Sequence, residues 1–158
     1  MNYKLYINLF LILSNGICYS QNSDSDCNPI FPKGSRADSD HFTGNVWSYP
    51  LVKDDSIYST VIGNVTFEAG ARSNWHLHNA GQILLITAGI GYYQEKGKPI
   101  KKMKKGDVIH CPPNVEHWHG ATPQSPCTHI AIVPNTEKGI VNWLRPVTDT
   151  EYNSYNNN

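Results

Sequence analysis

The stretch GARSNWHLHNAGQ, residues 70–82, places two histidines, His76 and His78, one residue apart. Side chains at positions i and i+2 of a β-strand point to the same face of the sheet. A strand through this stretch would therefore aim two imidazoles into one cavity. Neutral imidazole is a common protein ligand for metal ions, so the pattern indicates a metal site built on a strand.

A second stretch repeats the pattern. Residues 106–119 read GDVIHCPPNVEHWH and end on His117 and His119. Pro112 and Pro113 stiffen the loop that delivers these histidines, so the ligands need less ordering when an ion binds. Two such pairs in one small domain predict a shared metal cavity inside a β-barrel.

The rest of the chain also favours β-structure. Short runs with strand character alternate with turn residues, which is typical of an antiparallel barrel or sandwich, so the expected fold class is all-β. The expected strands cover residues 44–47, 58–67, 74–78, 82–87, 91–94, 108–111, 116–121 and 128–133. A last run at 140–144 leads into a possible short helix at 148–152.

The spacing Gly70-x5-His76-x-His78-x3-Gln82-x6-Gly89, followed by Gly106-x5-Pro112-x-Asn114-x2-His117, resembles the two motifs of the cupin family. Cupins are small double-stranded β-helix, or jelly-roll, barrels that usually hold one metal ion. The resemblance implies that the ion is bound by His76, His78, Gln82 and His117. Most cupins have glutamate at the position of Gln82 and glycine at that of Asn114, so both positions depart from the general pattern.

A resemblance to one group within the cupins explains the glutamine at position 82. The segments VTFEAGAR (65–72), WHLH (75–78), HWHGA (117–121) and THIA (128–131) are similar to the small cupins associated with carboxymuconolactone decarboxylases. That group includes manganese-dependent hydroxynitrile lyases, and its members use the glutamine as a metal ligand. The resemblance implies a divalent ion, with manganese expected and iron, zinc, nickel or cobalt as alternatives.

An amide oxygen from Gln82 is an uncharged donor, so the bound ion would keep its full charge and act as a stronger Lewis acid than beside a carboxylate. His119 shares the face of His117, and His129 shares the face of Ala131 and Val133. Both are candidate catalytic bases. In a lyase, one of them would take the hydroxyl proton of a cyanohydrin while the carbon–carbon bond breaks.

Two alternatives to a lyase remain open at this level. An open iron or manganese site could activate oxygen and cleave a phenolic or diketone substrate. A noncatalytic cupin could instead bind a small acid or sugar in its cavity. In all three cases the partner is a small molecule.

The predicted organisation is a signal peptide over residues 1–20, a flexible arm or edge segment over 21–41, the barrel over 42–147 and a C-terminal tail over 148–158. The apolar run from Leu5 to Leu13 is too short to span a bilayer, which favours a cleaved secretory signal. We therefore expect a secreted or periplasmic protein with no membrane anchor after cleavage. The mature chain would keep Cys27, Cys111 and Cys127, and the sequence does not choose a disulfide among them.

Charge excludes some partners. The chain carries 13 basic and 13 acidic side chains, and signal removal takes away only Lys4. This balance gives no reason to expect binding to nucleic acid or to an anionic membrane. Six lysines at 96–105 fit a solvated hairpin, with a basic binding patch as the alternative. Exposed strand edges and an apolar outer face favour a homodimer.

Overall fold

The computed structural model describes residues 30–155, and nearly all of its regular structure is antiparallel β-sheet. The predicted signal peptide lies outside the described residues. The strands are β1 (Ser35–Arg36), β2 (Phe42–Thr43), β3 (Val46–Val52), β4 (Thr60–Phe67), β5 (Arg72–Ser73), β6 (His76–Leu77), β7 (Gln82–Glu95), β8 (Lys101–Lys104), β9 (Val108–Cys111), β10 (His117–Ala121), β11 (Cys127–Pro134) and β12 (Asn142–Trp143). The helices are the 3₁₀ turns η1 (Ser39–His41) and η2 (Thr136–Lys138) and the short helix α1 (Asp149–Tyr152).

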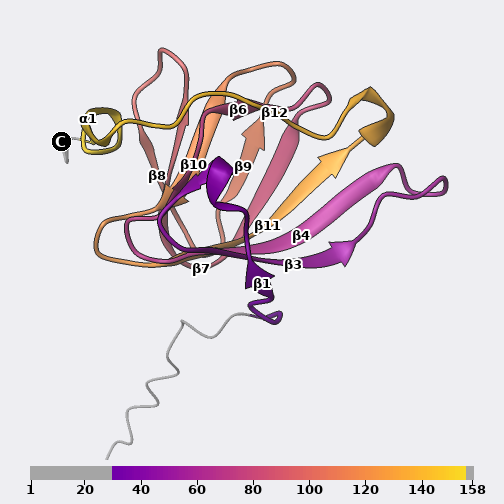
Figure 1. The fold of residues 1–158 in the computed structure, drawn as a ribbon, viewed down its shortest axis with the longest axis horizontal. Helices are drawn as coiled ribbons and strands as arrows, with labels where there is room; N and C mark the ends of the chain where they lie inside the picture. The colour runs from indigo at the N-terminus through magenta and orange to yellow at the C-terminus, as the bar shows by residue number, and fades with distance from the viewer. Residues whose placement is uncertain (1–29, 156–158) are drawn as a thin grey trace, which may run out of the picture.

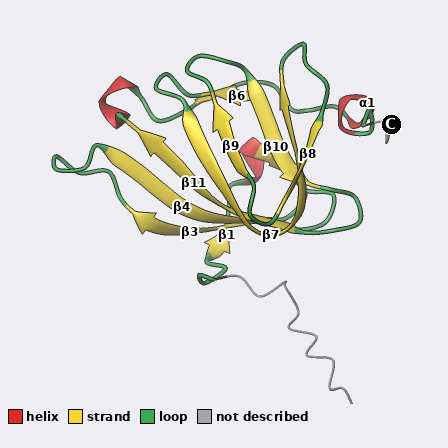
Figure 2. Ribbon diagram, turned by 180° about the vertical axis from the view of Figure 1, so that it is seen from behind, coloured by secondary structure: helices red, strands yellow, loops and turns green. Residues whose placement is uncertain are grey.

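The strands form one continuous sheet that curls on itself (Figure 1). Its main path runs β1-β3-β4-β11-β7-β10-β5-β2, while β8 and β9 pair with β7, and β6 joins β10 to β12. The reverse view shows β7 bending between the two halves of the curl (Figure 2). The predicted all-β jelly-roll barrel is confirmed, and the curl gives the molecule one interior face on which a site can form.

Strand β7 is longer than the sequence predicted. Separate strands were expected at 82–87 and 91–94, yet β7 runs without a break from Gln82 to Glu95. Its first half pairs with β9 and β11, and its second half pairs with β8 and β10. Gly89, with φ of 71°, lies where the strand passes from one set of partners to the other. The glycine permits a bend that a side chain would oppose, so the strand turns instead of ending.

The main core joins apolar side chains from several strands of the curl. Phe67 of β4, Leu84 of β7 and Met103 of β8 are fully buried and belong to one cluster. Buried and half-exposed residues alternate along the first half of β7, as expected for a strand with one face on a core. The buried polar residues include His76, His78, His117, His119 and His129, which lie beside this core.

The C-terminal tail packs against the second half of the sheet. The predicted helix at 148–152 is confirmed as α1, whose N-cap Thr148 forms a capping box with Glu151. Tyr152 is buried and donates a hydrogen bond to the carbonyl of Ala121 at 2.7 Å. The guanidinium of Arg72 lies over the Tyr152 ring and donates to the Val147 carbonyl, which fastens the tail to β5.

The described part of the N-terminal arm is an edge segment. Strand β1 pairs with β3, with Ser35 opposite Ser48, so the sheet begins before residue 42. Cys111 and Cys127 are buried free thiols, while Cys27 lies outside the described residues. Across residues 30–155, no helix has the length and apolar character needed to cross a membrane.

Candidate metal centre

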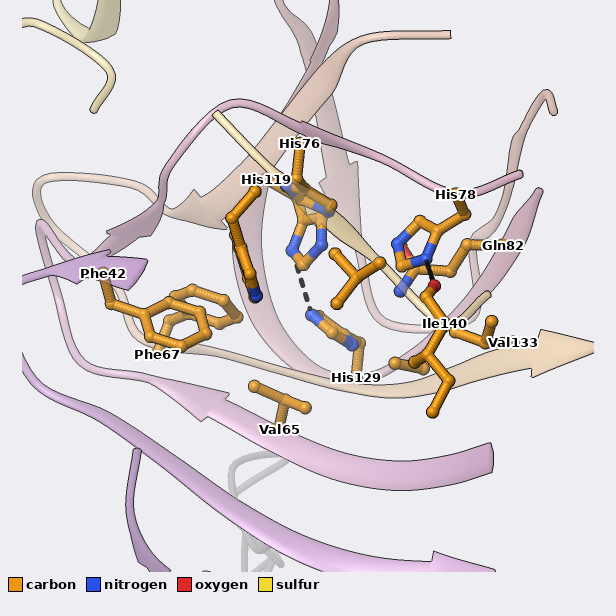
Figure 3. Close-up of a pocket in the computed structure, with 13 residues that line it drawn as sticks. Phe42, Val65, Phe67, His76, His78, Gln82, His119, His129, Val133 and Ile140 are labelled. Carbon is orange, nitrogen blue, oxygen red and sulfur yellow. Dashed lines mark hydrogen bonds between the residues drawn. The ribbon is translucent and has the colours of Figure 1, made fainter. Parts of the chain in front are cut away.

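A cavity of about 170 Å³ lies inside the curl, and five of the predicted site residues line it. These are His76, His78, Gln82, His119 and His129. Figure 3 shows the four histidines turned toward one space, with Gln82 beside His78. The sixth, His117, has no exposed surface and packs against His76, with ring centroids 4.3 Å apart. All six predicted residues therefore meet at one place.

Three of the imidazoles are held by backbone carbonyl groups. The Nδ1 atom of His76 lies 2.9 Å from the carbonyl oxygen of Asn74, and that of His117 lies 2.9 Å from the carbonyl oxygen of Val115. The Nδ1 atom of His78 lies 2.5 Å from the carbonyl oxygen of Ile140. A carbonyl can only accept, so each ring must donate from Nδ1. The neutral ring then carries its lone pair on Nε2, which is the arrangement of a metal-binding histidine.

The free ring nitrogens fit a metal ion. The Nε2 atoms of His78 and His117 are buried and have no hydrogen-bond partner among the described residues. Buried polar atoms normally have a partner, and an unpaired one costs free energy. An ion that accepted these lone pairs would remove that cost, so the donor set fits the metal that the sequence predicted.

Burial keeps these imidazoles neutral. It lowers the pKa of His117 to about 4 and that of His76 well below the ordinary value, and it lowers the pKa of His78 as well. Hydrogen bonds to the carbonyl groups oppose the effect without reversing it. Neutral rings are the form that binds a metal, so the site needs no prior deprotonation near pH 7.

Gln82 is the first residue of β7 and is only 7% exposed. The buried thiol of Cys111, across the strand pair, donates to the Gln82 Oε1 atom at 3.8 Å. This contact helps to orient the Gln82 amide, which also lines the cavity. Gln82 therefore lies among the histidines and offers an uncharged oxygen atom.

His119 and His129 form a second pair. The Nε2 atom of His129 lies 3.3 Å from the Nδ1 atom of His119, and both rings are buried. Burial lowers the pKa of His129 to about 4, and burial together with the His129 ring lowers that of His119 well below its ordinary value. Both rings are neutral near pH 7 and can accept a proton.

The metal could be arranged around a different trio from the one predicted. One ring nitrogen each from His76, His117 and His119 lie within 4.8 Å of one another. This cluster contains His119 in place of His78, which was the predicted third histidine ligand. The hydrogen bonds distinguish the two, because the Nδ1 atom of His119 meets another imidazole and not a backbone carbonyl.

The apolar wall of the cavity was not predicted from the sequence. It includes Trp143 on β12, whose ring lies 5.0 Å from that of His76 and stacks on His41 at 4.4 Å. Strand alternation could have placed Val65 and Phe67 on the inner face. The last strand-like run, 140–144, became β12 in part, but nothing in the sequence indicated that Ile140 or Trp143 would reach the cavity. The wall residues are Phe42, Val65, Phe67, Ala131, Val133, Ile140, Val141 and Trp143.

Comparison with known proteins places this site in a family. The model of the cupin domain matches residues 63–133, which include all six site residues. An (R)-mandelonitrile lyase of Granulicella tundricola is 41% identical over 113 residues, covering 72% of this chain and 86% of the lyase. The family match thus spans both histidine motifs.

Solved structures agree with the sequence matches. A cupin-like protein of Thermotoga maritima superimposes with a TM-score of 0.78 at 50% identity, over 79% of this chain and 95% of that one. The DMSP lyase DddQ of Ruegeria pomeroyi superimposes with a TM-score of 0.57 at 21% identity, over 77% and 62% of the two chains, which shows a shared fold alone. With its curled sheet, its paired histidine motifs and these relatives, the chain belongs to the cupin family.

Proposed function

We propose that this cupin is a metal-dependent lyase that cleaves a cyanohydrin to a carbonyl compound and hydrogen cyanide. The similarity to an (R)-mandelonitrile lyase supports the reaction class. The observation that carries the proposal is the pairing of a histidine metal site with two neutral, buried imidazoles in one apolar cavity. Such a cavity suits a small, largely apolar substrate.

The proposed ligands are His76, His78, His117 and Gln82. In each of the three histidines, Nδ1 donates a hydrogen bond to a backbone carbonyl group, which leaves Nε2 free to bind an ion. His119 has no such bond among the described residues, so His78 is favoured as the third imidazole ligand. When bound, a divalent ion, with manganese expected, would supply Lewis acidity that makes a substrate hydroxyl easier to deprotonate. Gln82 adds no charge, so the ion's positive charge stays available to an anionic oxygen.

His119 serves as the proposed base. If the Nδ1–H group of His119 donates a hydrogen bond to Nε2 of His129, the lone pair on Nε2 of His119 is free to accept the substrate's hydroxyl proton. As that proton leaves, the carbonyl double bond forms and the electron pair of the carbon–carbon bond departs with cyanide. The protonated His119 then returns its proton to cyanide, so hydrogen cyanide leaves and the site is restored.

The apolar wall binds the rest of the substrate. Phe67 contacts the rings of both His119 and His129, with centroids 5.6 Å apart in each case. Val65 and Ala131 continue the same surface. An aryl or alkyl group seated there would exclude water from the histidine pair, which strengthens hydrogen bonds to the developing charge.

Mandelonitrile cleavage by manganese-loaded protein tests the proposal. His119→Gln should retain the metal and lose about 10²- to 10⁴-fold in kcat, because it removes a general base and no ligand. His76→Ala should lose the metal and the activity together. His110→Gln, on an exposed position of β9, is the matched control and should behave as wild type.

Two results would contradict the lyase. One is aldehyde release by the loaded wild type that is no faster than by His76→Ala. The other is consumption of oxygen during turnover of catechol or flavonol substrates, since the proposed reaction involves no oxidation.

We also propose that the protein is exported and forms a homodimer. Ile62, Ile83 and Ile132 face one another across β4, β7 and β11 and are only half-buried in the single chain. A second copy would cover this row. Light scattering of the mature chain tests the homodimer. A monomer mass at micromolar concentration would contradict dimer formation.

A further inference from the structure

The segment between β11 and β12, residues 135–141, borders the cavity without joining the sheet. It is called the strap below. The strap supplies Ile140 and Val141 to the cavity wall, and its Ile140 carbonyl accepts the hydrogen bond from Nδ1 of His78. The tautomer and orientation of His78 thus depend on a part of the chain that strand pairing does not hold.

A single side chain fastens the strap on both sides of Ile140. Asn79, which directly follows His78, donates from Nδ2 to the carbonyl of Lys138 at 2.5 Å. Its Oδ1 atom accepts a hydrogen bond from Nδ2 of Asn142 at 2.9 Å. The two contacts lie two residues before and two residues after Ile140, so Asn79 closes a clamp around the carbonyl that holds His78.

The backbone of the strap is shaped for this clamp. Gly139 has φ of 97°, a conformation that favours glycine, and its N–H donates to the carbonyl of Thr136 at 2.9 Å. A Cβ atom at this position would lie 3.3 Å from Nδ2 of Asn79, tighter than an ordinary contact. Glycine therefore allows the Asn79 amide to approach the strap.

We propose that Asn79 is a positioning residue for the metal site, acting through the Ile140 carbonyl on His78. The inference rests on the proposed function, in which His78 is a ligand. Asn79 does not line the cavity, so it acts on the metal only through the strap. Loss of such an outer hydrogen bond typically lowers metal affinity by about 10- to 100-fold.

The role differs from general structural support. The two Asn79 hydrogen bonds are exposed to solvent and so contribute little to folding, and Asn79→Ala should lower the Tm by no more than about 4 °C. The same variant should bind cobalt(II) and manganese(II) about 10- to 100-fold more weakly than wild type. Its cobalt(II) visible spectrum should also change, because one ligand is no longer held in place.

Further variants separate the two halves of the clamp. Asn79→Asp keeps an acceptor for Asn142 but loses the donor to Lys138, and it should weaken metal binding nearly as much as Asn79→Ala. Asn142→Ala should have a smaller effect of the same sign, and it carries the test if the Asn79 variants fail to fold. Lys138→Ala is the matched control, since it removes an exposed side chain and leaves the carbonyl in place.

The outcomes distinguish the inference from the function on which it rests. If the wild type binds neither metal, the metal site itself is wrong. If the wild type binds metal and the Asn79 and Asn142 variants bind it with unchanged affinity and cobalt(II) spectrum, the positioning role is wrong. Weaker binding with a changed spectrum and a nearly unchanged Tm supports it.

Discussion

Gln82 is the residue whose chemistry separates this site from a cupin with a carboxylate ligand. A Gln82→Glu variant would place a negative charge beside the ion and partly neutralise it. We expect metal affinity to rise by about tenfold, equivalent to about 1.4 kcal/mol. The turnover of mandelonitrile should fall by at least about tenfold, because the ion polarises the substrate less.

Metal analysis beside steady-state kinetics checks this prediction. The expected pattern is more metal with less activity, which a misfolded variant would not give. A Gln82→Glu protein that holds stoichiometric metal and turns over faster than wild type would contradict the role given to the neutral amide.

The sequence predicted the site at the level of side chains and not of the main chain. Spacing and family resemblance brought His76, His78, Gln82 and His117 together, and strand alternation placed His129 on the inner face. The carbonyl of Ile140 could not be predicted in the same way, because every residue carries a carbonyl and only the folded path of the strap brings this one to His78. The difference in hydrogen bonding between His78 and His119 was hidden for the same reason.

At the scale of elements, β7 depends on Gly89. Gly89 and Gly106 both have positive φ, 71° and 90°, so alanine strains the backbone at either position. The two positions differ in the room available for an added Cβ atom. At Gly89 the Cβ would lie 1.9 Å from the carbonyl oxygen of Pro126, whereas at Gly106 no atom of the described chain would lie within 4 Å of it. We expect Gly106→Ala to cost about 1–2 kcal/mol and Gly89→Ala clearly more.

Denaturant unfolding of the two alanine variants measures the difference directly. Gly106→Ala serves as the control for backbone strain alone, so the excess cost at Gly89 reports the displacement of Pro126. Equal losses of stability would mean that β11 moves away from β7 without resistance, contrary to the close pairing of the two strands.

Helix α1 provides a pH-dependent contact. Arg145 donates to both carboxylate oxygens of Glu151, at 2.6 and 2.8 Å, and this lowers the pKa of Glu151 from 4.5 to about 2. A carboxyl group with a lowered folded pKa stabilises the protein above its unfolded pKa, and this contribution is lost as the pH falls from 4.5 to 2. Because the pair is partly exposed, the effect should be about 1 kcal/mol at most.

Unfolding free energies measured at pH 6, 4, 3 and 2 test the contact. Wild type should lose more stability over this range than Glu151→Gln. Arg145→Gln should reduce this difference without abolishing it, because hydrogen bonds from Thr148 also lower the pKa of Glu151. If Glu151→Gln and wild type show parallel pH profiles, the ion pair does not stabilise the folded state.

At the scale of the whole molecule, strand alternation and turn residues were enough to predict an all-β barrel. They did not predict that β7 would continue through Gly89, since a glycine inside an apolar run is equally typical of a turn. The path of the strap was also beyond prediction, because it depends on long-range hydrogen bonds such as those from Asn79 to Lys138 and from Thr136 to Ser59. Export and the homodimer stay predictions.

The cavity has walls of two kinds, and this bears on how its specificity can diverge. Val65, Phe67 and Ala131 stand on paired strands, where a substitution disturbs neighbouring registers. Ile140 and Val141 stand on the strap, and segments outside the sheet accept sequence change at little cost to folding. Changes confined to the side chains of Ile140 and Val141 can therefore give descendants of such a chain new substrates, because the backbone carbonyl that holds His78 stays in place.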